Sequence, residues 1–62
     1  MYTELKTKIL QEYEAQWRFA KVANINESSL SRIIRRELPV SIEKQREWAK
    51  LLNTRPEELF PQ

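Results

Sequence analysis

Hydrophobic residues recur along the chain at intervals of three and four, which is the spacing of one face of a helix, in five successive segments. The apolar stripe of the first segment consists of Leu5, Ile9 and Tyr13, with Leu10 at its edge. Thr3 stands where it can cap this helix, which we expect to run to about residues 12–14. We expect Tyr13 to belong to the core, because an aromatic side chain that ends an apolar stripe is usually buried.

Two segments over residues 16–36 have the clearest division into an apolar and a polar face. In the first of them Phe19, Ala20 and Ala23 share one face, and Arg18 and Lys21 point the other way. In the second, Leu30, Ile33 and Ile34 fall on one side; the other side carries Ser28, Arg32 and Arg35, flanked by Ser29, Ser31 and Arg36. A helix with this pattern packs its apolar face on a core and leaves hydroxyls and guanidiniums outside.

A short polar turn separates these two segments. Asn24 stands where the chain must reverse, and asparagine is the residue other than glycine that best tolerates the left-handed conformation of such a turn. We expect Ile25 to bury the turn and Asn26 to cap the helix that follows. Two helices joined in this way form a helix-turn-helix.

The C-terminal third of the chain predicts two more helices. Ser41 should cap the fourth, in which Ile42, Ala49 and Leu52 share a face and Trp48, at its flank, should be mainly buried. Gln45 interrupts that stripe and reaches either solvent or a phosphate; we expect solvent, since a buried unpaired amide is costly. Pro56 opens a last short helix with two glutamates in its first turn. The chain has no glycine, so the usual residue that ends a helix is missing throughout.

Composition excludes several classes of function. The 62 residues are enough for one domain, over residues 1–62, and include neither Cys nor His. Disulfides, thiolate chemistry and the commonest metal ligand and general base are therefore absent, and we expect no enzyme, no metal and no cofactor. No apolar run approaches the roughly 20 residues of a membrane span, so we expect a cytoplasmic protein.

The positive charge is concentrated in the middle of the chain. The net charge is +2, but residues 15–40 carry five Arg or Lys against two Glu, a net of +3, while the remainder carries six against seven, a net of −1. The basic character thus belongs to the predicted helix-turn-helix.

The spacing of several residues resembles the Cro and phage-repressor helix-turn-helix family of DNA-binding proteins. The residues that carry the resemblance are Gln16, Phe19, Ala20, Asn24, Ile25, Leu30, Ser31 and Ile33. Ala20 is small where two helices must cross at close range, and Asn24 departs from the family's usual glycine. The resemblance extends to Pro39, Ser41 and the segments 48–53 and 56–60. It implies a compact all-α bundle of five helices, the lambda-repressor-like fold.

The resemblance, together with the polar face, implies where DNA would be contacted. The second helix of the motif enters the major groove, with base contacts expected from Ser28, Ser29 and Arg32. Arg32 can form a bidentate pair with guanine. Phosphate contacts are expected from Gln16, Trp17, Arg35, Arg36 and Lys44. The alternative for the arginines and serines is a solvated face. For Trp17 the alternative is packing against Tyr13 or the first helix, and for Lys44 it is simple exposure.

A single recognition helix reads too few base pairs to select one genomic site, so we expect a weak two-fold dimer on a double-stranded operator. Leu59 and Phe60 are the expected dimer interface; the alternative for Phe60 is that it folds back onto Trp48 or the first helix. The expected function is that of a small phage-like or bacterial transcriptional regulator that represses by occluding its operator, without a small-molecule ligand. The alternative is a protein-interaction module, such as an antitoxin-like or adaptor domain.

Overall fold

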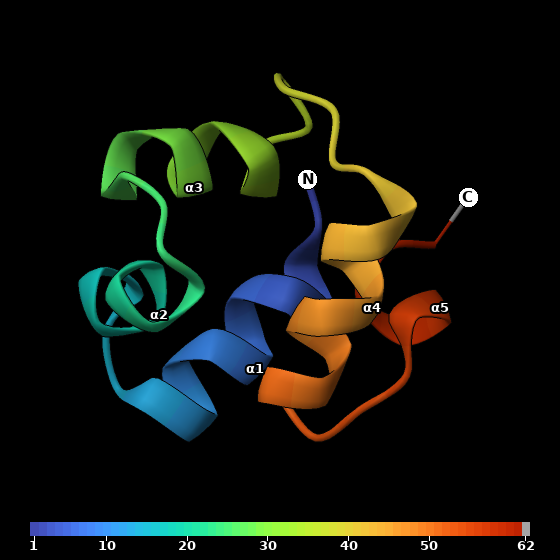
Figure 1. Ribbon diagram of the computed structural model, residues 1–62, viewed down its shortest axis with the longest axis horizontal. Helices are drawn as coiled ribbons and strands as arrows, with labels where there is room; N and C mark the ends of the chain where they lie inside the picture. The colour runs from blue at the N-terminus through green and yellow to red at the C-terminus, as the bar shows by residue number, and fades with distance from the viewer. Residues whose placement is uncertain (62) are drawn as a thin grey trace.

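The computed structural model describes residues 1–61, and within them it contains five α-helices and no strand (Figure 1). The helices are α1 (Thr3–Tyr13), α2 (Gln16–Ala23), α3 (Glu27–Ile34), α4 (Ile42–Leu51) and α5 (Pro56–Leu59). The radius of gyration is 10.1 Å, close to the roughly 10.6 Å expected for a folded chain of this length. The prediction of a compact all-α fold is therefore confirmed. Gln62, the last residue of the predicted domain, lies outside the described residues.

Helix α1 is the central element of the fold. It packs against α2 and α3 on one side and against α5 on the other, while α2 also packs against α3 and α4 against α5. Figure 1 shows this division, with α1 between the α2–α3 pair and the α4–α5 pair. The arrangement turns the apolar faces of α2 and α3 inward and leaves their opposite faces on the surface.

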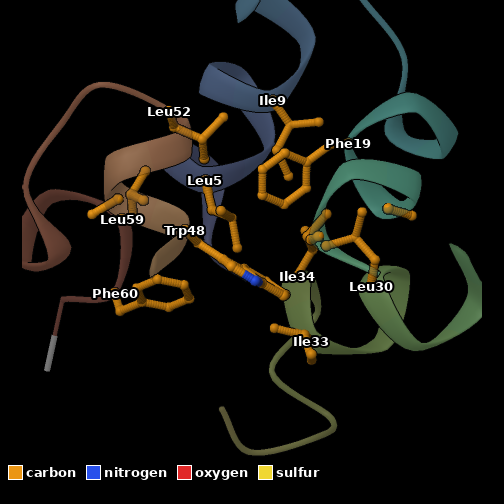
Figure 2. Packing of buried hydrophobic residues seen from close by; sticks show 13 residues of the cluster. Leu5, Ile9, Phe19, Leu30, Ile33, Ile34, Trp48, Leu52, Leu59 and Phe60 are labelled. Carbon is orange, nitrogen blue, oxygen red and sulfur yellow. The ribbon is translucent and has the colours of Figure 1, made fainter. Parts of the chain in front are cut away.

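The core is built around a row of aromatic side chains. Tyr13 meets Phe19 with ring centres 5.2 Å apart, and Phe19 meets Trp48 at 5.4 Å. Trp48 then approaches Phe60 at 6.2 Å, and Phe60 meets Tyr2 at 5.2 Å. Three of these four contacts are edge-on, the geometry that aromatic quadrupoles favour. The row crosses from Tyr13 at the end of α1 through α2 and α4 to Phe60 and Tyr2, so it joins both halves of the core. Figure 2 shows its three buried members, Phe19, Trp48 and Phe60.

The predicted core positions of the first four helices are buried or half-buried, except for Ile42 and for Leu10, the edge residue of the first stripe, which is 43% exposed. Trp48 is 1% exposed and Tyr13 is half-buried, its hydroxyl donating to the carbonyl of Leu51 at 3.0 Å. Ile42, however, is 62% exposed, which makes its prediction wrong. The buried residues of α4 all lie near its end, and Ile42 is about 10 Å further along the axis from Ala49. The first turn of α4 therefore stands beyond the helices that cover the rest.

Gln45 adopts neither of the two predicted roles. It is half-buried, and its side-chain amide Nε2 donates to the backbone carbonyl of Val40 at 3.2 Å. The expectation that Gln45 reaches solvent is therefore wrong. The bond satisfies a polar group of the segment that leads into α4, where the carbonyl of Val40 would otherwise need water.

The predicted dimer residues Leu59 and Phe60 are buried within the single chain. Leu59 is 0% and Phe60 is 4% exposed. Phe60 lies beside Trp48 and Tyr2 because α5 turns the chain back toward α1 and α4. The two side chains complete the core and present no surface to a second copy, so their assignment to a dimer interface is wrong. For Phe60 the alternative prediction, folding back onto Trp48, is confirmed.

Several helix ends rely on residues other than glycine. Ser41 caps α4 as predicted, its Oγ accepting from the backbone N–H of Lys44 at 3.2 Å. Thr3 is not a cap: Tyr2 holds that position, because the Tyr2 N–H donates to the Ile34 carbonyl at 2.7 Å and brings the chain into α1 one residue early. Positive φ angles occur at Glu14, Asn24, Arg36 and Asn53, with values of 70°, 61°, 65° and 54°.

Candidate nucleic-acid interface

Helix α3 is fully amphipathic. Its inner side chains, Leu30, Ile33 and Ile34, are 0%, 5% and 2% exposed. The outer face carries Ser28, Arg32 and Arg35, all of them exposed, while Ser29 and Ser31 at its margins are half-buried. Burial of three aliphatic side chains contributes several kcal/mol, at roughly 1.5–3 kcal/mol each, so the orientation of α3 about its axis is well fixed. The polar face is consequently held outward by the core beneath it.

The turn before α3 has the conformation that its sequence predicts. Asn24 lies in the left-handed region at φ 61° and ψ 45°. The N–H of Ile25 donates to the carbonyl of Ala20 at 2.9 Å, and the half-buried Ile25 side chain packs against the core. Asn26 occupies the cap position of α3 in an extended conformation, but its side chain makes no capping hydrogen bond. Ala20 is 3% exposed and so belongs to the buried face of α2, the helix that packs against α1 and α3.

The end of α3 is closed by two backbone hydrogen bonds. The N–H of Arg36 donates to the carbonyl of Ile33 at 2.9 Å, and that of Glu37 donates to the carbonyl of Arg32 at 2.8 Å. With Arg36 in the left-handed conformation, this is the Schellman arrangement that usually requires glycine. The guanidinium of Arg36 stacks on the ring of Tyr2, 4.6 Å from its centre. Arg36 is thus directed toward the N-terminus rather than toward the other two arginines.

Two arginines of the outer face share one carboxylate. Arg32 Nε lies 3.7 Å from Glu37 Oε1, and Arg35 Nε lies 3.3 Å from Glu37 Oε2. The side chains of all three residues are about half exposed, at 54%, 54% and 49%. Glu37 was missed as a candidate because it lies beyond the helix, outside the i, i+4 spacing that a sequence pattern reveals.

The start of α2 presents a second candidate surface. Trp17 is 52% exposed, and it is the aromatic residue that stands outside the aromatic row in the described part of the chain. The guanidinium of Arg18 lies 5.4 Å from the centre of its ring and pairs with Glu14 at 2.7 Å. Gln16 is half-buried beside it. The ring that packs on Tyr13 is that of Phe19, so Trp17 does not join the aromatic row.

The structure groups part of the candidate set and separates the rest. Ser28, Ser29 and Arg32 lie in α3, Arg35 is the residue that caps its C-terminal end, and Gln16 and Trp17 lie in the first turn of α2. Lys44 is exposed in the first turn of α4, a separate element that follows the loop after α3. No cluster of three or more His, Cys, Asp or Glu side chains within residues 1–61 is placed to hold a metal ion. None of the helices formed by these residues has the length and apolar character needed to cross a bilayer.

No protein-family model, curated protein or solved structure matches the chain.

Proposed function

We propose that this protein binds double-stranded DNA sequence-specifically through a helix-turn-helix formed by α2 and α3, as a small transcriptional regulator of the Cro and phage-repressor kind. The observation that carries the proposal is the outer face of α3, where Ser28, Arg32 and Arg35 are exposed opposite a fully buried apolar face. An α-helix fits the major groove of B-DNA, and these are side chains that read bases or meet phosphates there.

The roles of the side chains follow from their place along α3. Ser28 and Ser29 lie in its first turn, the part that contacts base edges in this class of motif. Arg32 follows one turn later and has the length and the planar fork that pair with guanine O6 and N7. Arg35 lies at the end of the helix, where its side chain reaches a phosphate more easily than a base edge.

The helix α2 would lie across the backbone of the same DNA segment. Its first turn carries backbone N–H groups near Gln16 and the exposed indole of Trp17. A helix N-terminus favours a phosphate, and an indole N–H can donate to one while its ring packs on sugar. Lys44 in the first turn of α4 is a further phosphate contact in the proposal.

The proposal is tested by measuring binding of fluorescent duplexes selected from mixed genomic fragments at several salt concentrations. Each phosphate neutralised should contribute about −0.9 to the slope of log K against log salt, so the two basic phosphate contacts proposed for each chain, Arg35 and Lys44, predict about −2 per chain. Arg32→Ala should lower affinity for the selected site at least tenfold, since one bidentate guanine pair is worth about 1–3 kcal/mol.

Arg46→Ala is the matched control for this substitution. Arg46 is an exposed arginine on α4 with the same charge, and it takes no part in the ion pairs that Arg32 and Arg35 form with Glu37. Arg46→Ala should lower the affinity for the selected duplex less than threefold, because it removes one positive charge and no base contact. Equal effects of Arg32→Ala and Arg46→Ala would contradict base recognition by Arg32. Absence of binding to any duplex at low salt would contradict the function.

Operator binding by two chains related by a dyad remains part of the proposal, with half-sites about 34 Å apart. Its interface is not formed by Leu59 and Phe60, since both are buried in the single chain. Footprints of the selected site would reveal the dyad, and binding of one chain to a single asymmetric half-site with full affinity would contradict it. A chain seated in the major groove over a promoter represses by occlusion.

A second candidate function, binding to another protein, is favoured by two large apolar side chains that are exposed on α2. Trp17 is 52% and Val22 is 54% exposed. Exposed large apolar side chains are a feature of contact surfaces. The two functions differ in salt dependence, because a partner held by Trp17 and Val22 would bind almost as well at high salt.

A further inference from the structure

Glu37 is placed to influence how the two outer arginines of α3 meet an anion. Its two carboxylate oxygens face different partners, Oε1 the Nε of Arg32 at 3.7 Å and Oε2 the Nε of Arg35 at 3.3 Å. One carboxylate therefore bridges two guanidiniums that are three residues apart, one in the last turn of α3 and one at its C-terminal cap. This is the position that a phosphate oxygen pair would take between the same two side chains.

The backbone holds Glu37 in this place. The Glu37 N–H donates to the Arg32 carbonyl at 2.8 Å, and Arg36 before it is in the left-handed conformation, bonded to Ile33. The Arg36 side chain is in turn stacked on Tyr2. The chain is thus turned back at the end of α3, so that the Glu37 side chain lies alongside the helix rather than pointing away from it.

These ion pairs contribute little to folding. All three side chains are about half exposed, and exposed pairs are worth about 0–1 kcal/mol. A carboxylate at the C-terminal end of a helix also meets the negative end of the helix dipole, which opposes its placement there. The 3.7 Å contact is too long for a hydrogen bond. The bridge is therefore weak enough for an anion to replace, and its placement is not explained by stability.

We propose that Glu37 is a specificity-determining residue that opposes DNA binding through phosphates alone. The inference rests on the proposed function. In the free protein the carboxylate neutralises one of the two positive charges on the outer face of α3. On a random duplex both arginines turn to phosphates, and the carboxylate between them repels those phosphates. On the selected site Arg32 pairs with a guanine instead of a phosphate, so the carboxylate meets fewer phosphates and the repulsion is smaller.

Repulsion of the wrong partner is a general route to specificity, because discrimination depends on the difference between two affinities. Segment 27–37 carries three arginines and two glutamates, a net charge of only +1. Replacement of Glu37 by a neutral residue would double that charge where it faces DNA. The affinity for non-specific DNA depends almost wholly on phosphate neutralisation, so this substitution should raise it more than the affinity for the specific site.

The test is Glu37→Gln, which removes the charge and keeps the size of the side chain. Affinities of wild type and variant are measured for a random duplex and for the selected duplex, between 50 and 200 mM salt, about the range over which phosphate contacts weaken steeply. We expect the affinity for random duplex to rise at least fivefold and that for the selected site less than twofold. The salt slope should steepen by about 1, the value of one further phosphate contact.

Glu12→Gln is the matched control, since Glu12 is an exposed glutamate of α1 and its substitution gives the same change in net charge. It should change both affinities less than twofold. Equal effects of the two substitutions would overturn the proposal, because only general charge would then matter. A fall in affinity for the selected site in Glu37→Gln would overturn it too, since Glu37 would then serve to orient the arginines.

A measurement without DNA tests the bridge itself. The Nε–H resonances of Arg32 and Arg35 should both shift in Glu37→Gln and stay unchanged in Glu12→Gln. Unchanged resonances would overturn the proposal whatever the DNA affinities. Failure of the proposed function is distinguishable from these outcomes, because wild type would then bind neither duplex at 50 mM salt, and both ideas would fall together.

Discussion

Replacement of Ala20 by leucine tests whether α2 and α3 cross as closely as their sequences require. Ala20 is 3% exposed on α2, which packs against α3, and its carbonyl accepts the N–H of Ile25 from the turn between the two helices. Phe19 and Ala23 on either side are also buried. A larger side chain at position 20 must therefore push α3 outward or adopt a strained rotamer.

The expected loss of stability is large for a chain of this size. Overpacking of a core position costs about 1–3 kcal/mol, while a chain of 62 residues has a total stability of about 3–9 kcal/mol. At an unfolding entropy of about 2.1 cal/mol/K per residue, the loss corresponds to a fall in Tm of about 8–23 °C. DNA affinity measured well below the lower Tm should change only in proportion to the folded fraction.

Thermal unfolding followed by circular dichroism at 222 nm is the assay. Lys21→Leu is the control, because it places the same side chain on the next, exposed residue of α2. It should alter the Tm by only a few degrees, as surface substitutions usually stay within about 0.5 kcal/mol. A variant Ala20→Leu that melts within about 2 °C of wild type would refute the close crossing and with it the helix-turn-helix assignment.

Three further predictions concern the hydrogen bond of Tyr13, the left-handed conformation of Asn24 and the carboxylate of Glu58. Tyr13→Phe should lower the free energy of unfolding by about 0.5–1.5 kcal/mol, because the carbonyl of Leu51 loses its donor; urea titration measures the change. Asn24→Ala should destabilise by about 1 kcal/mol through the left-handed turn, whereas Asn24→Gly should not. The hydrogen bond from Thr54, then that from the Arg55 backbone, lowers the pKa of Glu58 in the folded chain. The ionised carboxylate of Glu58 therefore stabilises the fold above the pKa it has in the unfolded chain, and this stabilisation is lost as pH falls through its pKa in the folded chain. When Tm is measured against pH in the acid range, the fall in Tm due to Glu58 should be absent in Glu58→Gln.

Much of the fold was predictable because the helical stripes are regular. The inward faces of α2 and α3, the left-handed Asn24 and the Ser41 cap all follow from local spacing and side-chain chemistry. Errors occurred where an element's neighbours decide the outcome. Ile42 continues the stripe of α4 but lies beyond the helices that cover that face. Leu59 and Phe60 are too close to the chain end for a pattern to tell core from interface.

The sequence predicted the exposed face of α3 but not the contact of Glu37 with its arginines. Local periodicity places Ser28, Arg32 and Arg35 on one exposed face, because that needs only the pitch of a single helix. The contact of Glu37 with two of them depends on Arg36 adopting a left-handed conformation, which arginine rarely does. Composition alone could not reveal that one of the two glutamates in the basic segment lies against its arginines.

The most direct test of DNA recognition by α3 is a titration of ¹⁵N-labelled protein with the selected duplex, followed by amide and indole chemical shifts. The proposal predicts the largest changes at Ser28, Ser29, Arg32 and Arg35. The indole N–H of Trp17, which is 52% exposed, should move, while that of Trp48, which is 1% exposed, should stay. Changes centred on α4 and α5, with α3 unaffected at saturation, would contradict recognition of DNA by the outer face of α3.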